Sequence, residues 1–453
     1  MKTCHKSFVH GLALLIGLGG WGATVPTVMA NSPQPPAKVQ KVSQTEIQYI
    51  TKYQMKDKKA EIAASTPDGK QLIVTQAAQG SISIVSIADL EHIVEKQTIR
   101  FQQLSPRAEV TSTAVTPDGK YALVTVRTGD DVNTPNKGLV AVVDLQTYQT
   151  VKTYQVGIGP DSIAISHDGK TAVICNEDEE LDPAQENEID YSKVKRPGTI
   201  SILSFPDGDV LRGTHKELSI RLDGLGNHVV YPNDPQPEYV AISPNDTQAA
   251  VTLQENNAIA LIDLKQQRIT KIFGLGVTKH KADLKNDGVV SFQNDLVARP
   301  ESDGITWTWD GKYMVTANEG DLGKNEFKDG VMSGGRNISV WDQTGRLVYD
   351  SKELIDQANA KSNLYPDKRS PNRGSEVENL TIGEIGTKSI LAVASERGNS
   401  ILFFDLTKTE QPEYLGLLPS GGEGPEGIHK IHGRDLFVSA DEETGTLSFY
   451  GIK

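Results

Sequence analysis

The sequence contains little cysteine, no excess of basic residues and no long apolar run beyond its first 30 residues. Two cysteines in 453 residues, Cys4 and Cys175, exclude a disulfide-dense scaffold and a zinc site made of thiolates. Lysine and arginine number 46 against 59 acids, and the formal charge of −13 argues against a surface that follows nucleic acid. With 37% hydrophobic residues, the chain is neither disordered throughout nor a polytopic membrane protein.

The first 30 residues differ in composition from the rest of the chain. Two lysines give a positive start, a glycine-rich apolar stretch runs from Phe8 to Trp21, and Val28-Met29-Ala30 offers a small-residue cleavage site. This order is typical of a secretory signal peptide, and the apolar stretch is shorter than the roughly 20 residues that a membrane span needs. We therefore expect an exported protein, periplasmic or extracellular, with a signal peptide (1–30), a proline-rich flexible tether (31–43) and one folded domain (44–453).

A turn motif centred on Asp-Gly recurs along the folded domain. Thr66-Pro67-Asp68-Gly69-Lys70 reappears at 116–120 and, with changes, at 166–170, so these copies are 50 residues apart. Each turn precedes a β-rich run and a further strand, and two later units keep the strands without the turn. Units of 40–50 residues with four short strands are typical of propellers. Seven such units predict an all-β fold, a seven-bladed β-propeller with four-stranded blades.

Two further features concern the ends of the ring and its loops. The strand-like segment 47–53 has no partner in the first unit, and the seventh unit ends after its third strand. We expect this N-terminal strand to complete the last blade and close the ring. Insertions at 177–195, 278–299 and 351–373 lengthen the middle units, and the last of them begins with a short helical pattern.

Acidic residues recur at two fixed places in the units. The first place, directly after the second strand, holds Glu177, Glu255, Glu319, Glu396 and Glu442, whereas units one and two have Ala77 and Arg127. The second place, at the start of the innermost strand, holds Glu61, Asp161, Glu238, Glu301 with Asp303, Glu378 and Glu426. Both places lie on the same face of a propeller, so both series are expected to ring one mouth of the channel.

Converging carboxylates repel one another unless a cation or an arginine compensates them. Hard oxygen ligands suit Ca²⁺ or another divalent cation. The candidate metal ligands are Glu177, Glu238, Glu255, Glu301, Asp303, Glu319, Asp321, Glu378, Glu396, Glu426 and Glu442. The alternative is that each acid accepts backbone N–H bonds at a strand end and recurs because the units arose by duplication.

Signals of a catalytic nucleophile are missing. The sequence has no Gly-x-Ser-x-Gly elbow, and its Ser-x-x-Lys at 192–195 lacks the accompanying motifs. His429 and His432 are three apart on a predicted strand, which places them on opposite faces, and Cys175 is expected to be a buried, inert thiol. Arg373, in a basic loop, and Arg397 are candidates for binding an anion such as phosphate, or for neutralising their acidic neighbours.

Several motifs in fixed order resemble a known family. The Asp-Gly-Lys repeats resemble YVTN-type seven-bladed propellers, and a tighter set is similar to the choice-of-anchor I domain: Pro237-Glu238-Tyr239-Val240, Asn318-Glu319-Gly320-Asp321, Gly335-Arg336-Asn337, Glu378-Asn379-Leu380, Glu396-Arg397 and Gly424-Pro425-Glu426-Gly427. The resemblance implies export, a propeller, and a shared ligand site at these acidic motifs, Asp321 included. Some members are described as phytase-like or alkaline-phosphatase-like.

Two functions follow as hypotheses. The first is an exported propeller that acts as a binding scaffold, with a cation or small-molecule ligand at the acidic channel mouth and no nucleic-acid partner. The second is a metal-dependent phosphoesterase, in which clustered carboxylates hold metal ions and Arg373 or Arg397 orients phosphate.

Overall fold

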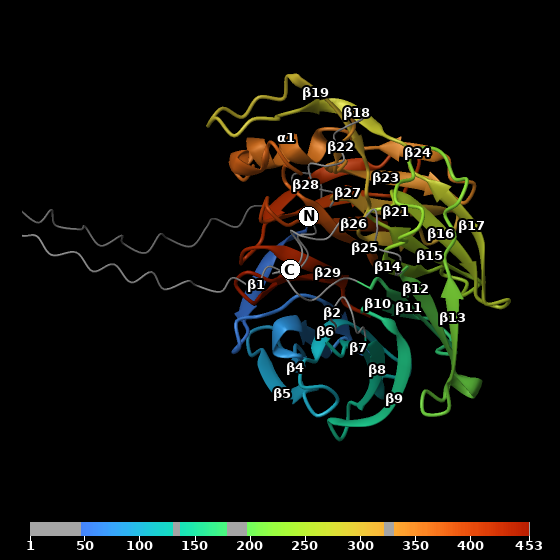
Figure 1. Cartoon of the computed structure of the whole chain (residues 1–453). Helices are drawn as coiled ribbons and strands as arrows, with labels where there is room; N and C mark the ends of the chain where they lie inside the picture. Colours follow the sequence, from blue (N-terminus) through green and yellow to red (C-terminus); the bar gives the residue numbers. More distant parts are fainter. Residues whose placement is uncertain (1–46, 130–135, 179–196, 321–329, 453) are drawn as a thin grey trace, which may run out of the picture.

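The computed structural model describes residues 47–129, 136–178, 197–320 and 330–452, and these residues form seven antiparallel sheets of four strands and one sheet of three. The signal peptide and tether predicted for 1–43 lie outside the described residues, as does most of the acidic insertion at 177–195. The prediction of an all-β propeller is confirmed, because each four-stranded sheet follows the order that the repeat predicts (Figure 1).

The innermost strand of each sheet lies at the centre of the molecule. These strands contact one another in chain order, and the last of them also contacts the first. They are β2 (Ala63–Ser65), β6 (Glu109–Val115), β10 (Pro160–Ile165), β14 (Pro237–Ile242), β20 (Ile305–Trp307), β25 (Val377–Ile385) and β29 (Pro425–Lys430).

The second and third strands are the most buried, because a neighbouring sheet covers each of their faces, so both read as nearly continuous apolar runs. The second strands are β3 (Gln71–Gln76), β7 (Tyr121–Arg127), β11 (Thr171–Asn176), β15 (Gln248–Leu253), β21 (Tyr313–Asn318), β26 (Lys388–Ser395) and β30 (Leu436–Asp441). The third strands are β4 (Ser81–Ser86), β8 (Lys137–Asp144), β12 (Thr199–Ser204), β16 (Ala258–Asp263), β23 (Asn337–Asp342), β27 (Ser400–Asp405) and β31 (Thr446–Gly451).

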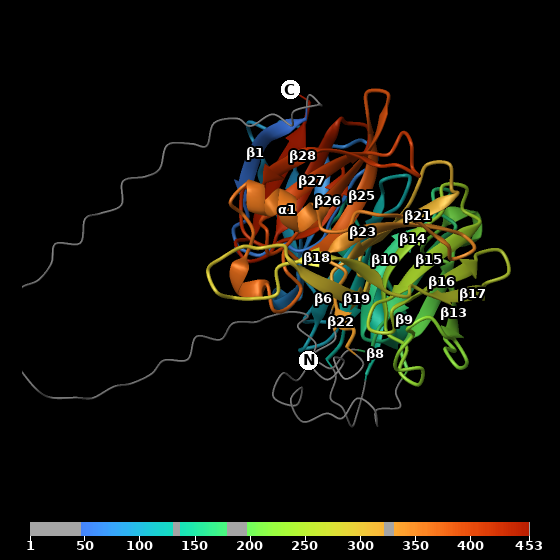
Figure 2. The ribbon, with the colours of Figure 1, turned by 90° about the horizontal axis from the view of Figure 1, so that it is seen from above.

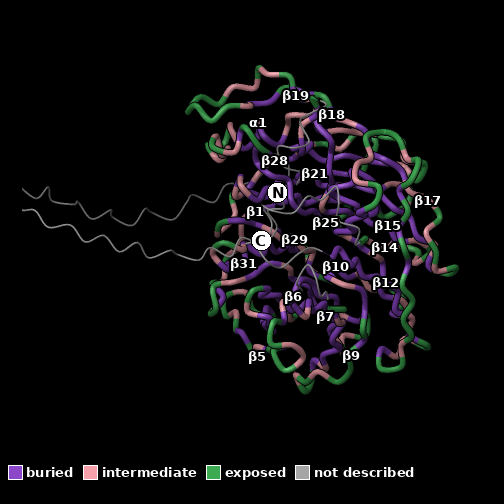
Figure 3. Tube along the Cα trace, viewed as in Figure 1, coloured by how far each residue is buried: buried purple, intermediate pink, exposed green. Residues whose placement is uncertain are grey.

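The outer strands face solvent, and Figure 3 shows their exposed residues around a buried interior. Six of them follow the third strand of their own sheet: β5 (Val94–Arg100), β9 (Gln149–Ile158), β13 (Thr214–Ser219), β17 (Arg268–Gly274), β24 (Leu347–Asp350) and β28 (Glu413–Pro419). The seventh outer strand is β1 (Gln48–Gln54), which pairs antiparallel with β31 at the other end of the chain.

The hydrophobic core is divided among the interfaces between neighbouring sheets. One cluster joins Val173 and Ile202 of one sheet to Val251 and Ile262 of the next. A corresponding cluster joins the first sheet to the last, and it contains Leu72, Val74, Val438 and Phe449. Residues at the two ends of the chain are therefore held together by packing as well as by the β1–β31 ladder.

The Asp-Gly turn recurs because it makes the same contacts in successive sheets. In the first copy the Thr66 hydroxyl donates to Asp68 Oδ1 at 2.6 Å, and the Lys70 N–H donates to the same oxygen at 3.1 Å. Gly69 has a φ of +65°, which a residue with a side chain adopts only with strain. A Cβ at Gly119 would lie 3.3 Å from Pro67 Cδ, so the proline of one turn packs on the glycine of the next.

Two of the insertions fold into defined elements that lie together outside the seven sheets (Figures 1 and 2). The helix predicted at the start of 351–373 is confirmed as α1 (Leu354–Lys361). The insertion at 278–299 forms most of the three-stranded sheet β18 (Thr278–Ala282), β19 (Asn294–Arg299) and β22 (Met332–Ser333). Arg336 is fully buried between them and donates to the carbonyl oxygens of Asp283, Ser370 and Asn372.

Gly445 offers a test of how tightly the start of the described chain is held against the last sheet. It has a φ of +63°, and an added Cβ would lie 2.0 Å from the Lys58 carbonyl carbon. We expect Gly445→Ala to lower the free energy of unfolding by about 1–3 kcal/mol more than Gly386→Ala, because overpacking adds to the strain of left-handed backbone. Gly386 is the control position. Its φ is +60° and an added Cβ would have no neighbour within 4 Å, so Gly386→Ala introduces the backbone strain without the overpacking. Equal losses of unfolding free energy in the two variants, measured by urea unfolding, would contradict a tight contact between Gly445 and Lys58.

Candidate functional site

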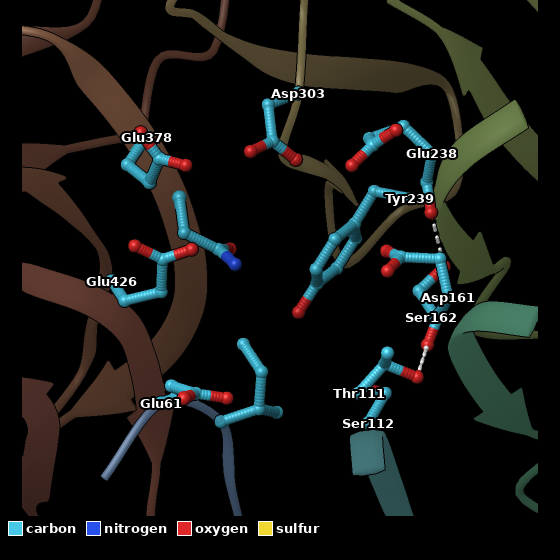
Figure 4. Close-up of a pocket in the computed structure, with 12 residues that line it drawn as sticks. Glu61, Thr111, Ser112, Asp161, Ser162, Glu238, Tyr239, Asp303, Glu378 and Glu426 are labelled. Carbon is cyan, nitrogen blue, oxygen red and sulfur yellow. Dashed lines mark hydrogen bonds between the residues drawn. The ribbon is translucent and has the colours of Figure 1, made fainter. Parts of the chain in front are cut away.

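Six of the seven innermost strands place one carboxylate around a single small cavity (Figure 4). These acids stand at or just before the start of their strands: Glu61, Asp161, Glu238, Asp303, Glu378 and Glu426. The remaining inner strand, β6, supplies Thr111 and Ser112. The cavity measures about 40 Å³, and none of its lining residues is lysine or arginine. We call it the acidic cavity.

The two predicted acidic series meet at this end of the channel. Three groups in the described part of the chain combine both series, with carboxylate oxygens that all lie within 4.8 Å of one another: Asp161 with Glu177 and Glu238, Asp303 with Glu319 and Glu378, and Glu396 with Glu426 and Glu442. A fourth group joins Glu319, Glu376 and Glu396. The repeat brings these acids together because every unit turns its inner-strand start and its second-to-third loop to the same face.

Arg127 stands in the place where five other units have glutamate, and it neutralises part of the acidic cluster. Its Nη2 donates to Asp161 Oδ1 at 2.9 Å and to Glu177 Oε2 at 3.0 Å. The Arg127 side chain is only 3% exposed. One unit of the repeat thus supplies an internal cation to the acids of the next.

On the other side of the mouth, three arginines surround Glu376, which is fully buried. Arg369 and Arg397 donate to its carboxylate, and Arg373 Nε lies 3.8 Å from it. Arg373 also pairs with Glu319, and Arg397 with Glu396 at 2.6 Å. Burial alone would lower the pKa of Arg397, but the charges of Glu396, Glu376 and Glu443 raise it above its usual value. The two arginines predicted to bind an anion therefore contact carboxylates of this chain.

Two acids of the cavity, Glu238 and Glu378, are less well compensated. Burial first, and then the charges of Glu177 and Asp161, raise the pKa of Glu238 well above its ordinary value. Burial and the charges of Glu319 and Glu426 do the same for the pKa of Glu378. No donor in the described part of the chain reaches Oε2 of Glu238 or Oε2 of Glu378, although both residues are buried. An ionised carboxylate in such surroundings needs a cation or a proton.

Tyr239 was not among the predicted site residues, although it follows Glu238 directly. Figure 4 shows its hydroxyl pointing into the middle of the acidic cavity. Burial, together with the charges of Asp303 and Asp161, raises its pKa to about 12, so the side chain stays a neutral phenol at physiological pH. Sequence reasoning missed it because a tyrosine on a strand is usually a core residue.

Glu376 was also missed, and the sequence contains a signal for it. Glu301 and Glu376 each stand two residues before an acid of the cavity, Asp303 and Glu378, and both have left-handed backbone, with φ of 46° and 50°. Two other units have glycine at this place, Gly159 and Gly424, also with positive φ. A glutamate where the backbone favours glycine is held there by its contacts.

Not every predicted ligand joins the four groups. Glu301 is fully buried and accepts a hydrogen bond from the Ser333 hydroxyl, and it lies outside the groups. Glu255 is outside them as well, but its charge raises the pKa of Glu238. Asp321 lies outside the described residues.

The expectation for the histidine pair is wrong. β29 ends at Lys430, so His432 lies in the following turn and not on the opposite face of the strand. His429 Nε2 and His432 Nδ1 approach the same Ser65 hydroxyl at 2.9 and 2.8 Å. Ser65 ends β2 of the first sheet, so this contact ties the first sheet to the last. Cys175 is fully buried, as expected.

Comparison with known proteins gives a family and a fold. The family model described as "Choice-of-anchor I domain" matches residues 61–331 and 322–409. Gigasin-3a of Magallana gigas is 27% identical over 183 residues, which covers 32% of this chain and 64% of Gigasin-3a, less than two thirds of its length.

Two solved structures resemble the whole fold. The Kuenenia stuttgartiensis hydrazine synthase matches with a TM-score of 0.56 at 15% identity, over 88% of this chain and 96% of that one. The β-propeller domain of Myceliophteria thermophila Cps50 (Swd1) matches with a TM-score of 0.53 at 9% identity, over 89% of this chain and 100% of that one. At such identities the likeness concerns the propeller fold alone. No helix in the described part of the chain is long and apolar enough to cross a membrane.

Proposed function

Because the chain belongs to the choice-of-anchor I domain family, we propose that it is an exported propeller scaffold that binds a divalent cation in its acidic cavity. Choice-of-anchor domains are typically found on exported proteins, which agrees with the signal peptide that the sequence predicts. The propeller supplies a rigid ring of strands, and each strand presents one short segment at the channel mouth.

One observation carries the proposal. Six carboxylates from six strands line a cavity of about 40 Å³ whose lining contains no basic side chain. Carboxylates at such short range are mutually repulsive, and a divalent cation offsets this repulsion while using their oxygens as ligands. Ca²⁺ accepts six to eight oxygen ligands with flexible geometry, and the hydroxyl of Tyr239 adds a neutral oxygen to the set.

The arginines favour a scaffold over a phosphoesterase. A phosphate-binding arginine needs its guanidinium fork free for substrate, whereas Arg373 and Arg397 donate to Glu319, Glu376 and Glu396. We expect no hydrolysis of p-nitrophenyl phosphate or phytate by the mature protein, with or without Ca²⁺. Activity that disappears on chelation would support the phosphoesterase instead.

Thermal unfolding with and without divalent cations tests the proposal. We expect Ca²⁺, Mg²⁺ or Mn²⁺ to stabilise the chelator-treated mature protein, by about 2.7 kcal/mol at a hundredfold excess over the dissociation constant. Asp303→Asn removes a carboxylate of the cavity without changing its shape and should reduce this stabilisation. Asp295→Asn is the matched control, since its side chain is 84% exposed. A wild-type protein that no divalent cation stabilises would refute the proposed function.

A further inference from the structure

Four carboxylates of the acidic cavity, together with two glutamates beside it, form two halves. Asp161, Glu177 and Glu238 form one group of mutually close oxygens, and Asp303, Glu319 and Glu378 form the other. Two oxygens on opposite sides of one Ca²⁺ lie at most about 5 Å apart, so each group has the dimensions of one ion's ligand set. In the described part of the chain no such group joins the two halves. Figure 4 shows Asp303 between Glu238 and Glu378, at the boundary of the halves.

The first half contains one buried carboxylate oxygen without a donor. Arg127 contacts Asp161 and Glu177 of this half at 2.9 and 3.0 Å. Glu238 is only 5% exposed, and no donor in the described part of the chain reaches its Oε2. This half therefore offers one buried, unsatisfied oxygen on a residue that lines the cavity.

The second half has the same feature. Arg373 contacts Glu319 of this half. Glu378 is 6% exposed, and no donor in the described part of the chain reaches its Oε2.

We infer that the acidic cavity holds two divalent cations, one bound by Asp161, Glu177 and Glu238 and the other by Asp303, Glu319 and Glu378. The inference rests on the proposed function and specifies its ligand. Carboxylate and phenol oxygens select hard ions such as Ca²⁺, Mg²⁺ or Mn²⁺ over soft ones. The cavity of about 40 Å³ exceeds the roughly 10–15 Å³ that a single water needs, so it has room for ions and their bound waters.

The number of bound ions tests the inference. Calorimetric titration of chelator-treated mature protein with Ca²⁺, checked by native mass spectrometry, should give two ions per wild-type chain. Glu238→Gln and Glu378→Gln each remove one of the unsatisfied oxygens, and each variant should bind one ion. The double variant should bind none, and Asp295→Asn should still bind two.

The outcomes separate this inference from the proposed function. One ion per wild-type chain, or two ions retained by either single variant, overturns the two-ion arrangement and leaves the proposed function standing. No ion in the wild-type chain overturns both. The number of ions bound by the wild-type chain needs no substitution, so it tests the two-ion arrangement even where a variant fails to fold. Circular dichroism identifies such a variant.

Discussion

Arg127→Met should lower the free energy of unfolding of the divalent-free protein by about 3–5 kcal/mol at pH 7, since removing one partner of a buried ion pair leaves uncompensated buried charge. Arg127 is 3% exposed and bridges Asp161 and Glu177, which are held close to Glu238. Methionine keeps much of the side-chain volume, so the loss measures the charge and its hydrogen bonds and not a cavity. Urea unfolding in the presence of a chelator provides the measurement.

The same variant should respond more strongly to divalent cations. Without the guanidinium, Asp161 and Glu177 lose a cationic partner, and a bound divalent cation recovers part of the lost stability. Arg212→Met is the control, because Arg212 pairs with Asp209 at the surface and its removal should leave the unfolding curve unchanged. A small effect of Arg127→Met would show that the neighbouring carboxylates are already protonated at pH 7.

Glu238→Gln should have the opposite effect and stabilise the divalent-free protein by about 1–3 kcal/mol at pH 7.5, the usual cost of a buried group without its partner. Glutamine has nearly the same shape and no charge, so it removes the repulsion by Glu177 and Asp161 that acts on Glu238. A substitution that stabilises the chain while abolishing a ligand position is expected where function and stability conflict.

The pH dependence of this gain has a definite sign. Folding raises the pKa of Glu238 above its ordinary 4.5, so the carboxyl binds a proton more tightly in the folded protein than in the unfolded chain. The stability that the protonated Glu238 carboxyl contributes is present below pH 4.5 and is lost as the pH rises through the folded-state pKa of this group. The advantage of Glu238→Gln should therefore shrink as the pH is lowered from 7.5 toward 4.5. An advantage that grows on acidification would contradict the assignment.

The sequence alone was sufficient to predict the propeller, for local physical reasons. Each Asp-Gly turn is stabilised by hydrogen bonds among its own Thr or Ser, Asp and Lys residues, so the motif can be recognised in the sequence wherever it occurs. The strands between the turns are apolar because sheets cover both of their faces. A repeat of this kind also fixes which acids occupy equivalent positions, and this is why both acidic series could be read from the aligned units.

Charge compensation, in contrast, depends on contacts between residues far apart in the chain. Arg127 contacts Glu177, 50 residues away, and Arg373 contacts Glu319, 54 residues away. Both positions differ from the repeat, so the alignment marks them as departures without naming their partners. The convergence of His429 and His432 on Ser65 spans more than 360 residues and has no local signal at all.

The sequence by itself therefore determined the fold and the two acidic series, because turns, strand runs and repeat positions are local properties. Only the tertiary structure decided which acids are paired with arginines and which, like Glu238 and Glu378, keep an oxygen without a donor. Electrostatic compensation is a property of distances across the channel, and these distances exist only once the sheets have packed around it.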